Sequence, residues 1–340
     1  MSSMESGVGE ARLVGTLYAP AEERAPAVAR APERYQLVCV PLDGSPQSEH
    51  ALPWARALAR RLDARLCFVH VHQAGSDRAY TGRGAYARRE NEQRCEESRY
   101  LWSKVDMGGR EPAAASVVMG GRVPDALLRF GREQHVDLVV MTAYGANGTG
   151  HPWLGSVADR VLRSARVPVL VVPVGADAPD MTQMPLVRRV LVPLDGSSAA
   201  EEVLPHALTL GDASGAGYTL VRVEPVPARR GSPDGQHAPE RGAENAAPVG
   251  HAAQRYLDYV AARLRERGAN VDVRVVVDAH AAESVLALAD EIDADLIALT
   301  LHGDGGRQRR LLGSLADKVI RSASRPVLAY RPRGTRPRPA

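Results

Sequence analysis

The chain contains a long internal repeat, which constrains its fold more than any other feature. The segment VCVPLDGSPQSEHALPWARALA begins at Val38 and returns, in the form VLVPLDGSSAAEEVLPHALTLG, at Val190, which is 152 residues further on. A second segment, DLVVMTAYGANGTGHPWLGSVADRVLRSARVPVLVV from Asp137, returns as DLIALTLHGDGGRQRRLLGSLADKVIRSASRPVLAY from Asp295, 158 residues further on. Solenoid repeats have periods of about 20 to 50 residues, so a period of about 150 indicates two duplicated domains instead.

Composition excludes several classes of protein. Hydrophobic residues make up 44% of the 340 residues, enough for two substantial cores. No stretch approaches the roughly 18 to 20 uninterrupted apolar residues of a membrane helix, and residues 1–33 lack the basic start and apolar core of a signal peptide. The net charge is only +3 and the arginines are spread along the chain, which gives little support to nucleic-acid binding. We therefore expect a soluble, cytoplasmic protein.

The three cysteines, Cys39, Cys67 and Cys95, are far apart and form no C-x-x-C pair. Neither a disulfide framework nor a zinc site is indicated. Cys39 and Cys67 lie in apolar runs, which predicts that they belong to a core.

Within each copy, short β-branched runs alternate with amphipathic stretches, a pattern typical of a parallel sheet covered by helices on both faces. A helix is predicted over residues 48–61, where apolar residues recur at i, i+3 and i+4. Each copy is interrupted after its second strand, most clearly between Pro225 and Val249, which predicts loops or flaps. Five strands fit each copy, near residues 36–42, 65–72, 115–119, 137–142 and 167–173, and near residues 188–194, 218–224, 271–277, 295–300 and 326–331.

These patterns divide the chain into two domains with short flanking segments. We expect the domains to cover residues 34–175 and 188–331, joined by a linker over residues 176–187. Residues 1–33 form an N-terminal extension of unassigned structure, and residues 332–340 an Arg/Pro-rich tail with no means of building a core.

Two acidic turns lie where a ligand is expected. In an open parallel sheet, ligands bind outside the carboxyl ends of the strands. Pro41 and Asp43 follow the first strand of the first copy, and Pro193 and Asp195 follow that of the second. A carboxylate there could accept hydrogen bonds from ribose hydroxyls or help to hold a cation. Asp-Gly-Ser is also an ordinary turn and helix-start sequence, so this alternative remains open.

A glycine-bearing loop follows the fourth strand of each copy and ends at Gly-Ser, directly before an amphipathic run. Main-chain amides at such a helix start attract phosphate, and glycine lets the anion approach the backbone. The alternative is a plain helix N-cap after a flexible loop. No G-x-x-x-x-G-K-[ST] or G-x-G-x-x-G motif occurs, which weakens the classical NTPase and dehydrogenase interpretations. The loop residues are Thr142, Gly145, Gly155 and Ser156 in the first copy and Thr300, Gly303, Gly313 and Ser314 in the second.

The pair of signatures, VPLDGS after the first strand and G-x9-G-S before the last helix, resembles the universal stress protein family. The resemblance covers both halves and implies a tandem member of the family. It implies an α/β fold of two doubly wound α/β sandwich domains, each with a five-stranded parallel sheet of order 3-2-1-4-5, similar to the adenine nucleotide alpha hydrolases. The family's ATP-binding pattern is G-x2-G-x9-G-[ST], and Thr142 and Thr300 replace its first glycine, which puts one phosphate contact in doubt.

By this resemblance ATP is the expected ligand of both domains. In the first domain, adenine and ribose would lie against Pro41, Asp43 and Val71, with the phosphates over Gly145, Gly155 and Ser156. In the second, the matching residues are Pro193, Asp195, Val223, Gly303, Gly313 and Ser314. Family members also associate through their last strand, so the two halves could pair about a pseudo-twofold axis, and a homodimer is a further expectation.

The two copies differ in their charges. The second loop carries Arg307, Arg309 and Arg310, whereas the first carries no lysine or arginine and has Arg122 after its third strand instead. We hypothesise that the second site uses loop arginines for phosphate charge, and that the first uses Arg122, main-chain amides and Mg²⁺, with Asp43 and Asp195 as candidate ligands of the ion. The alternative is that these arginines are solvated loop residues.

Three functions remain in view. The first is an ATP-binding, nucleotide-dependent regulator of the cellular stress response, more a binding protein than an enzyme. The second is a weak ATP hydrolase, for which His151 and His302 are candidates only by proximity, since no lysine lies in either loop. The third is a nucleotide-free scaffold that acts through dimerisation, which the two Thr-for-Gly positions would favour.

Overall fold

The computed structural model describes residues 34–72, 83–106, 113–119, 122–145, 154–212, 214–226, 247–301 and 312–332. The predicted N-terminal extension therefore lies outside the described residues, as do residues 333–340 of the tail and most of the interval between Pro225 and Val249. None of the described helices is both long and apolar enough to cross a membrane.

Each half of the chain alternates strands with helices, as predicted. The first half contains β1 (Leu37–Pro41), α1 (Pro46–Glu49), α2 (Ala51–Leu62), β2 (Arg65–His72), α3 (Arg83–Asp106), β3 (Ala113–Met119), α4 (Val123–Glu133), β4 (Leu138–Thr142), α5 (Ser156–Ser164) and β5 (Val169–Val172). The second half contains β6 (Arg189–Pro193), α6 (Ser198–Glu201), α7 (Leu204–Asp212), β7 (Gly217–Glu224), α8 (Ala247–Arg265), β8 (Asn270–Val277), α9 (Ala281–Glu291), β9 (Leu296–Thr300), α10 (Ser314–Ser322) and β10 (Val327–Tyr330).

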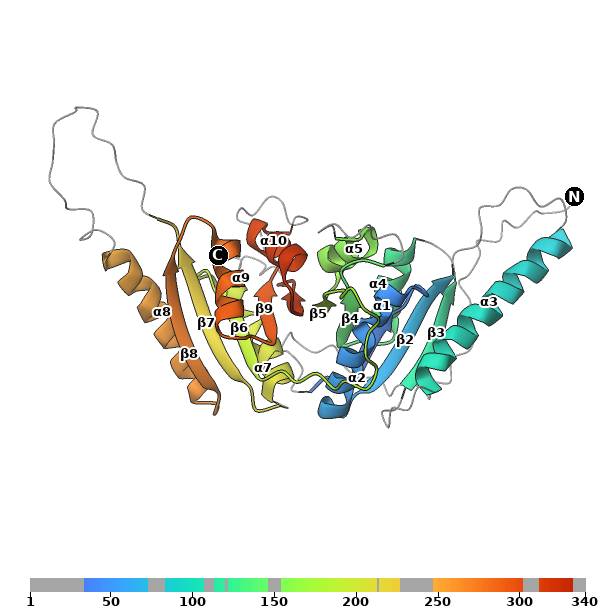
Figure 1. Cartoon of the computed structure of the whole chain (residues 1–340), viewed down its shortest axis with the longest axis horizontal. Helices are drawn as coiled ribbons and strands as arrows, with labels where there is room; N and C mark the ends of the chain where they lie inside the picture. Colours follow the sequence, from blue (N-terminus) through green and yellow to red (C-terminus); the bar gives the residue numbers. More distant parts are fainter. Residues whose placement is uncertain are drawn as a thin grey trace, which may run out of the picture.

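The strands form one continuous ten-stranded sheet, β3-β2-β1-β4-β5-β10-β9-β6-β7-β8 (Figure 1). Within each half every strand pair is parallel and the order is 3-2-1-4-5, which confirms the predicted doubly wound topology. In the first half, β1 lies between β2 and β4, so the direction of winding reverses beside it. A ligand is expected at the carboxyl ends of these strands.

Both faces of the sheet are buried, which explains the continuous apolar runs of its strands. Val38 and Val40 of β1 belong to the core on the face covered by α2, whereas Leu37 and Cys39 belong to the core that Phe130 of α4 covers. Cys39 and Cys67 are buried, as predicted, and burial raises the pKa of the Cys39 thiol. Cys95 is exposed.

The helix predicted over residues 48–61 is in fact two helices, α1 and α2, which meet at His50. Pro53 has no N–H, so the carbonyl of Glu49 cannot receive the usual bond from four residues ahead. The second half repeats the break between α6 and α7, where Pro205 stands in the same relation to Glu201. The break lets the chain turn sharply between the end of β1 and the helix that covers the sheet.

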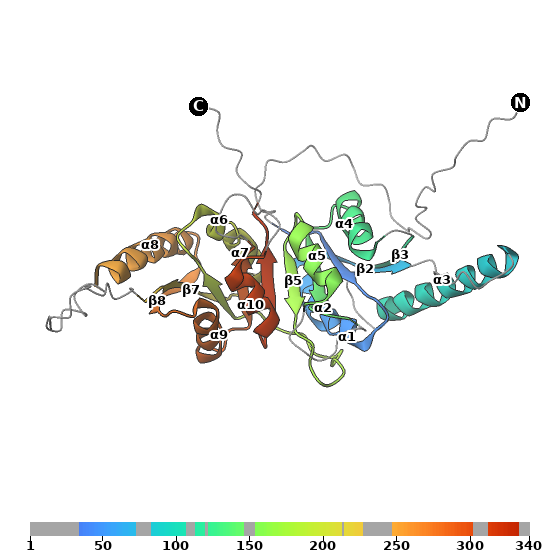
Figure 2. The ribbon, with the colours of Figure 1, turned by 90° about the horizontal axis from the view of Figure 1, so that it is seen from above.

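The two halves join through their last strands. β5 and β10 pair antiparallel, with Val171 opposite Val327, and α5 and α10 lie on the same side of this junction (Figures 1 and 2). The pairing removes two apolar sheet edges that would otherwise be exposed. It is the pairing of the halves expected from the sequence, here within one chain.

A buried polar cluster also connects the halves. Tyr35, just before β1, places its hydroxyl 2.9 Å from Nδ1 of His206 on α7, and the ring of His206 lies 4.3 Å from the ring of Tyr330. Tyr35 has no exposed surface, and burial raises the pKa of its phenol. On the pseudo-symmetric side the matching positions are Val187 and Trp54, so this tyrosine–histidine pair is not repeated there.

Candidate functional site

A cavity of about 1040 Å³ opens at the carboxyl ends of β1, β2 and β4 in the first domain. Its floor is apolar, formed by residues such as Leu42, Val69 and Met141. It lies where the doubly wound topology places a ligand. Of the residues predicted for the first site, Arg122 does not line this cavity. The others do: Pro41, Asp43, Val71, Thr142, Gly145, Gly155 and Ser156.

Asp43 and Gly145 lie in contact at this edge, although they come from the ends of different strands. Oδ1 of Asp43 accepts hydrogen bonds from the main-chain N–H of Ser45, at 2.9 Å, and from its hydroxyl. A Cβ atom on Gly145 would overlap Oδ2 of Asp43, so only glycine permits this approach. The turn interpretation is also correct, because Ser45 caps α1 by accepting from Ser48 N–H at 3.2 Å. The turn and the site use the same carboxylate.

Helix α5 begins beside Tyr144, the neighbour of Gly145, and its first residues line the same cavity. Gly155 is its N-cap, so no cap side chain reaches the first amides of the helix. The N–H of Gly155 donates to the carbonyl of Ala143 at 2.8 Å, and a Cβ atom there would lie 3.2 Å from that oxygen. The contact with Ala143 therefore holds the start of α5 close to the end of β4, and the first residues of α5 line the cavity, where their free amides would suit an anion.

Thr142 replaces a glycine of the resembled pattern, and its side chain has a local partner. The hydroxyl donates to the carbonyl of Tyr144 at 2.9 Å, and the residue is buried. Donation of this hydroxyl to a phosphate would therefore compete with a bond inside the loop. Thr300, its counterpart, is equally buried.

The sequence prediction missed the wall contributed by α3, which includes Gln93, Glu96, Glu97 and Tyr100. The residues after β2 were predicted only as loops or flaps, and α3 contains neither of the two sequence signatures that pointed to the site. The signal that could have found it is the Tyr-Leu pair at residues 100–101, which returns at residues 256–257.

Glu97 links two histidines of β2 at this wall. Nδ1 of His72 donates to Glu97 Oε2 at 2.8 Å. Nδ1 of His70 donates to the carbonyl of Leu42 at 2.8 Å, and its Nε2 lies 3.5 Å from Glu97 Oε1. These donor roles follow from the acceptor-only nature of a carbonyl and an ionised carboxylate.

Tyr100 is fixed beside this cluster. Its hydroxyl donates to Glu49 at 3.0 Å, and Lys104 also pairs with Glu49 at 2.8 Å. Burial, and then the Glu49 carboxylate, raise the pKa of the Tyr100 phenol, so it remains a neutral donor at physiological pH.

The charge of the cavity is acidic. Its described lining includes Asp43, Glu96 and Glu97 but no lysine or arginine. Arg122 is exposed at the N-cap of α4 and is not among the lining residues. No group of three or more histidine, cysteine or acidic side chains in the described part of the chain is arranged to hold a metal ion. Among the described lining residues, the groups that could balance an anion are the α5 amides, and a cation that accompanies the anion would add positive charge.

Mg²⁺ fits this arrangement in its usual role with phosphates. The ion is commonly held by one or two carboxylates together with substrate phosphate oxygens, not by a cage of protein ligands. Asp43 projects one carboxylate oxygen toward Gly145, beside the start of α5. Asp43 is thus the residue that would hold the ion, and the ion would supply the positive charge that the wall lacks.

The second domain repeats the frame but fills it differently. Oδ1 of Asp195 accepts from Ser197 N–H at 2.9 Å, and Gly313 is the N-cap of α10. The matching strand ends and helix start hold four of the predicted residues, Pro193, Val223, Thr300 and Ser314. Outside the described residues lie Gly303, Arg307, Arg309 and Arg310, and also the candidate histidines His151 and His302.

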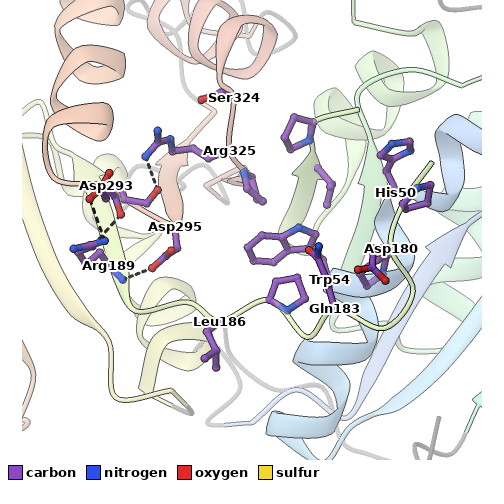
Figure 3. A pocket seen from close by; sticks show the side chains of 17 residues that line it. His50, Trp54, Asp180, Gln183, Leu186, Arg189, Asp293, Asp295, Ser324 and Arg325 are labelled. Carbon is purple, nitrogen blue, oxygen red and sulfur yellow. Dashed lines mark hydrogen bonds and ion pairs between the residues drawn. The ribbon is translucent and has the colours of Figure 1, made fainter. Parts of the chain in front are cut away.

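A second cavity, of about 560 Å³, lies between the domains (Figure 3). Trp54 forms one wall, and Arg189 and Arg325 stand on the other. Both guanidinium groups are engaged: Arg189 donates to the carbonyl of Asp293 at 2.9 Å, and Arg325 to the carbonyls of Ala289 and Ala294 at 2.7 and 2.6 Å. This cavity contains none of the predicted site residues, so the one at the strand ends is the candidate site.

Comparison with known proteins agrees with the geometry. The model of the universal stress protein family matches residues 34–173 and 187–331. A universal stress protein of Mycobacterium tuberculosis is 28% identical over 310 residues, which cover 88% of this chain and 98% of that protein. One from Mycolicibacterium smegmatis is 30% identical over 208 residues, 58% of this chain and 62% of the relative.

Solved structures show the same fold. A universal stress protein from Archaeoglobus fulgidus superposes with a TM-score of 0.60 at 20% identity, covering 88% of this chain and 98% of that one. A protein of unknown function from Pseudomonas aeruginosa gives a TM-score of 0.58 at 14% identity, covering 88% and 94%. With the family match over both halves, these similarities establish that the chain belongs to the universal stress protein family and carries two of its domains in tandem.

Proposed function

We propose that the chain binds ATP in the cavity of its first domain and acts as a nucleotide-dependent regulator in the stress response. One observation carries the proposal: Asp43 and Gly145 pack together beside the glycine-capped start of α5, within one cavity. A carboxylate suited to ribose hydroxyls would then lie next to amides suited to phosphates, which supports the proposal. The names of the relatives support the connection with stress.

Each part of the nucleotide has a chemically suited wall. The amides at Ser156 and the residues after it suit the phosphates, and Oδ2 of Asp43 suits the ribose hydroxyls. Pro41, Val71 and Leu127 offer an apolar surface for the base. The cavity is large enough for a drug-sized ligand, since such sites commonly measure about 300 to 1,000 Å³.

Binding is favoured over catalysis. Phosphoryl transfer needs positioned cations and a group that orients the nucleophile. His70 is bonded to the Leu42 carbonyl, and Tyr100 donates to Glu49, so these lining side chains already have structural partners. We expect any hydrolysis of bound ATP to be slow compared with its release.

The test is to identify what the purified protein carries and what it binds. Mass spectrometry of the small molecules released on denaturation should detect ATP or ADP, and titration calorimetry with ATP and Mg²⁺ should show binding. Gly155→Asp would place a carboxylate beside the α5 amides and should abolish the binding in the first domain, whereas Gly313→Asp, the matched change in the second domain, should leave the binding in the first domain unchanged. Absence of released nucleotide together with absence of binding in the unmodified protein would contradict the proposal.

A further inference from the structure

The space above the acidic turn differs between the two domains. Gly44 and Gly196 follow Asp43 and Asp195 and have nearly equal φ angles, 87° and 90°. A Cβ atom on Gly44 would meet nothing within 4 Å, whereas one on Gly196 would lie 2.5 Å from Nη1 of Arg222. Gly44 lines the cavity of the first domain, so in the second domain a guanidinium group occupies the corresponding space.

Arg222 is held in this position by two neighbours. Its Nε lies 2.5 Å from Oε1 of Glu224, and its guanidinium carbon lies 5.5 Å from the ring centroid of Tyr256 on α8. The Arg222 and Glu224 side chains are only 25% and 12% exposed, so water screens the pair less than it would on an open surface. Tyr256 is itself fixed by donation to Glu201 at 3.2 Å.

The first domain places different residues at the same positions. His70 corresponds to Arg222, because each follows the residue paired with the proline that ends the central strand. The short imidazole of His70 stays beside the Leu42 carbonyl and faces Glu97 of α3. Where α3 has Glu97, three residues before Tyr100, α8 has the buried Ala253, three residues before Tyr256. The acidic partner thus comes from the helix in one domain and from the strand in the other.

We propose that Arg222 closes the sugar end of the second domain's nucleotide site, so that the chain binds nucleotide first and more tightly in its first domain. The inference rests on the proposed function, because Asp195 and Gly196 are taken to hold the sugar as Asp43 and Gly44 do. A nucleotide in the second domain has to displace Arg222 from Glu224 and Tyr256. If the closed arrangement is nine-tenths populated, the apparent affinity of that site falls about tenfold.

The test exchanges the two residues. Arg222→His gives the second domain the residue of the first and should strengthen nucleotide binding there about tenfold. Gly145→Ala should weaken binding in the first domain about a hundredfold, so titration calorimetry with ATP and Mg²⁺ in that background reports mainly on the second site. His70→Arg in the unmodified protein should weaken the first site.

Arg274→His is the matched control. Arg274 on β8 pairs with Val221 on β7, so the two side chains point to the same face of the sheet. Arg222 is the next residue after Val221 and points to the opposite face. This variant loses the same charge from the same domain, and its binding should match that of its parent. At a free ATP concentration between the two dissociation constants, native mass spectrometry should count about one nucleotide per unmodified chain and about two per Arg222→His chain.

Each contrary outcome identifies what fails. Two equal sites in the unmodified protein, unchanged by Arg222→His, would overturn the closure and leave the proposed function intact. Weaker binding in Arg222→His would show that the arginine is a ligand of the nucleotide and would overturn the closure as well. No binding in any variant would remove the proposed function and the closure with it.

Discussion

The two domains of this chain share a backbone frame and differ in the side chains that fill it. Both end their central strand in Pro-Leu-Asp-Gly-Ser, and both start their last helix at Gly-Ser. At the end of the second strand, however, His70 and His72 pair with Glu97 of a helix, whereas Arg222 pairs with Glu224 of its own strand. The difference teaches that a duplicated frame fixes where a ligand can bind, while two or three nearby residues determine whether it has access.

The largest predicted effect comes from Gly145→Ala in the first domain. The added methyl group would overlap Asp43 Oδ2 and push the carboxylate away from the start of α5, so ATP binding there should weaken about a hundredfold. Gly131→Ala on α4 is the control, because a Cβ atom there meets nothing within 4 Å. Titration calorimetry measures both; equal affinities would remove the role given to this contact.

The contact of Glu97 with His70 and His72 in the first domain can be tested through stability. Glu97→Ala takes the carboxylate acceptor from Nδ1 of His72, a residue with no exposed surface, and should lower the free energy of unfolding by about 2 kcal/mol. Glu92→Ala, on an exposed turn of the same helix, should change it by less than about 0.5 kcal/mol. Urea unfolding compares them, and an equal effect of the two would mean that Glu97 does not stabilise the domain through His72.

The acidic turns sharpen the comparison between the sites. Asp43→Asn removes the charge that would hold ribose and Mg²⁺, so it should weaken ATP binding about tenfold. Asp195→Asn should change total binding at limiting ATP by less than about twofold, since Arg222 already closes that site. A larger loss from Asp195→Asn than from Asp43→Asn would reverse the assignment of the stronger site.

Much of this frame could be predicted from the sequence. The strand ends, the order 3-2-1-4-5 and the residues that line the first cavity followed from the repeat, the apolar runs and the resemblance of two short signatures. These features depend on local patterns: glycine where the backbone approaches a carboxylate, and β-branched residues where a strand is buried on both faces.

The remaining features depend on contacts between distant segments, which the sequence does not display. The break at His50 follows from one missing N–H at Pro53, which was predicted to be tolerated within a single helix. Glu97 meets His72 only because α3 packs over β2, and Arg222 reaches Gly196 only because its side chain is long enough to cross the strand end. The distribution of charged residues along the sequence predicted Arg122 as the phosphate-binding cation of the first site, but Arg122 does not line the cavity.

The smallest predicted effect concerns the junction, which is also asymmetric. Tyr35→Phe removes the hydroxyl that meets His206 and should lower the free energy of unfolding by about 1 kcal/mol. Val187→Ala changes the apolar counterpart on the other side and tests whether the two sides contribute differently. If Tyr35→Phe leaves urea unfolding unchanged, the hydroxyl contributes nothing to holding the domains together.

A crystal structure of the full chain grown with ATP and Mg²⁺ tests the central claim most directly. We predict a nucleotide in the first domain, with its ribose against Asp43 and its phosphates over the amides at Gly155 and Ser156, while Arg222 remains on Glu224. A nucleotide bound elsewhere in that domain, or bound equally in both domains with Arg222 still in place, would contradict the account.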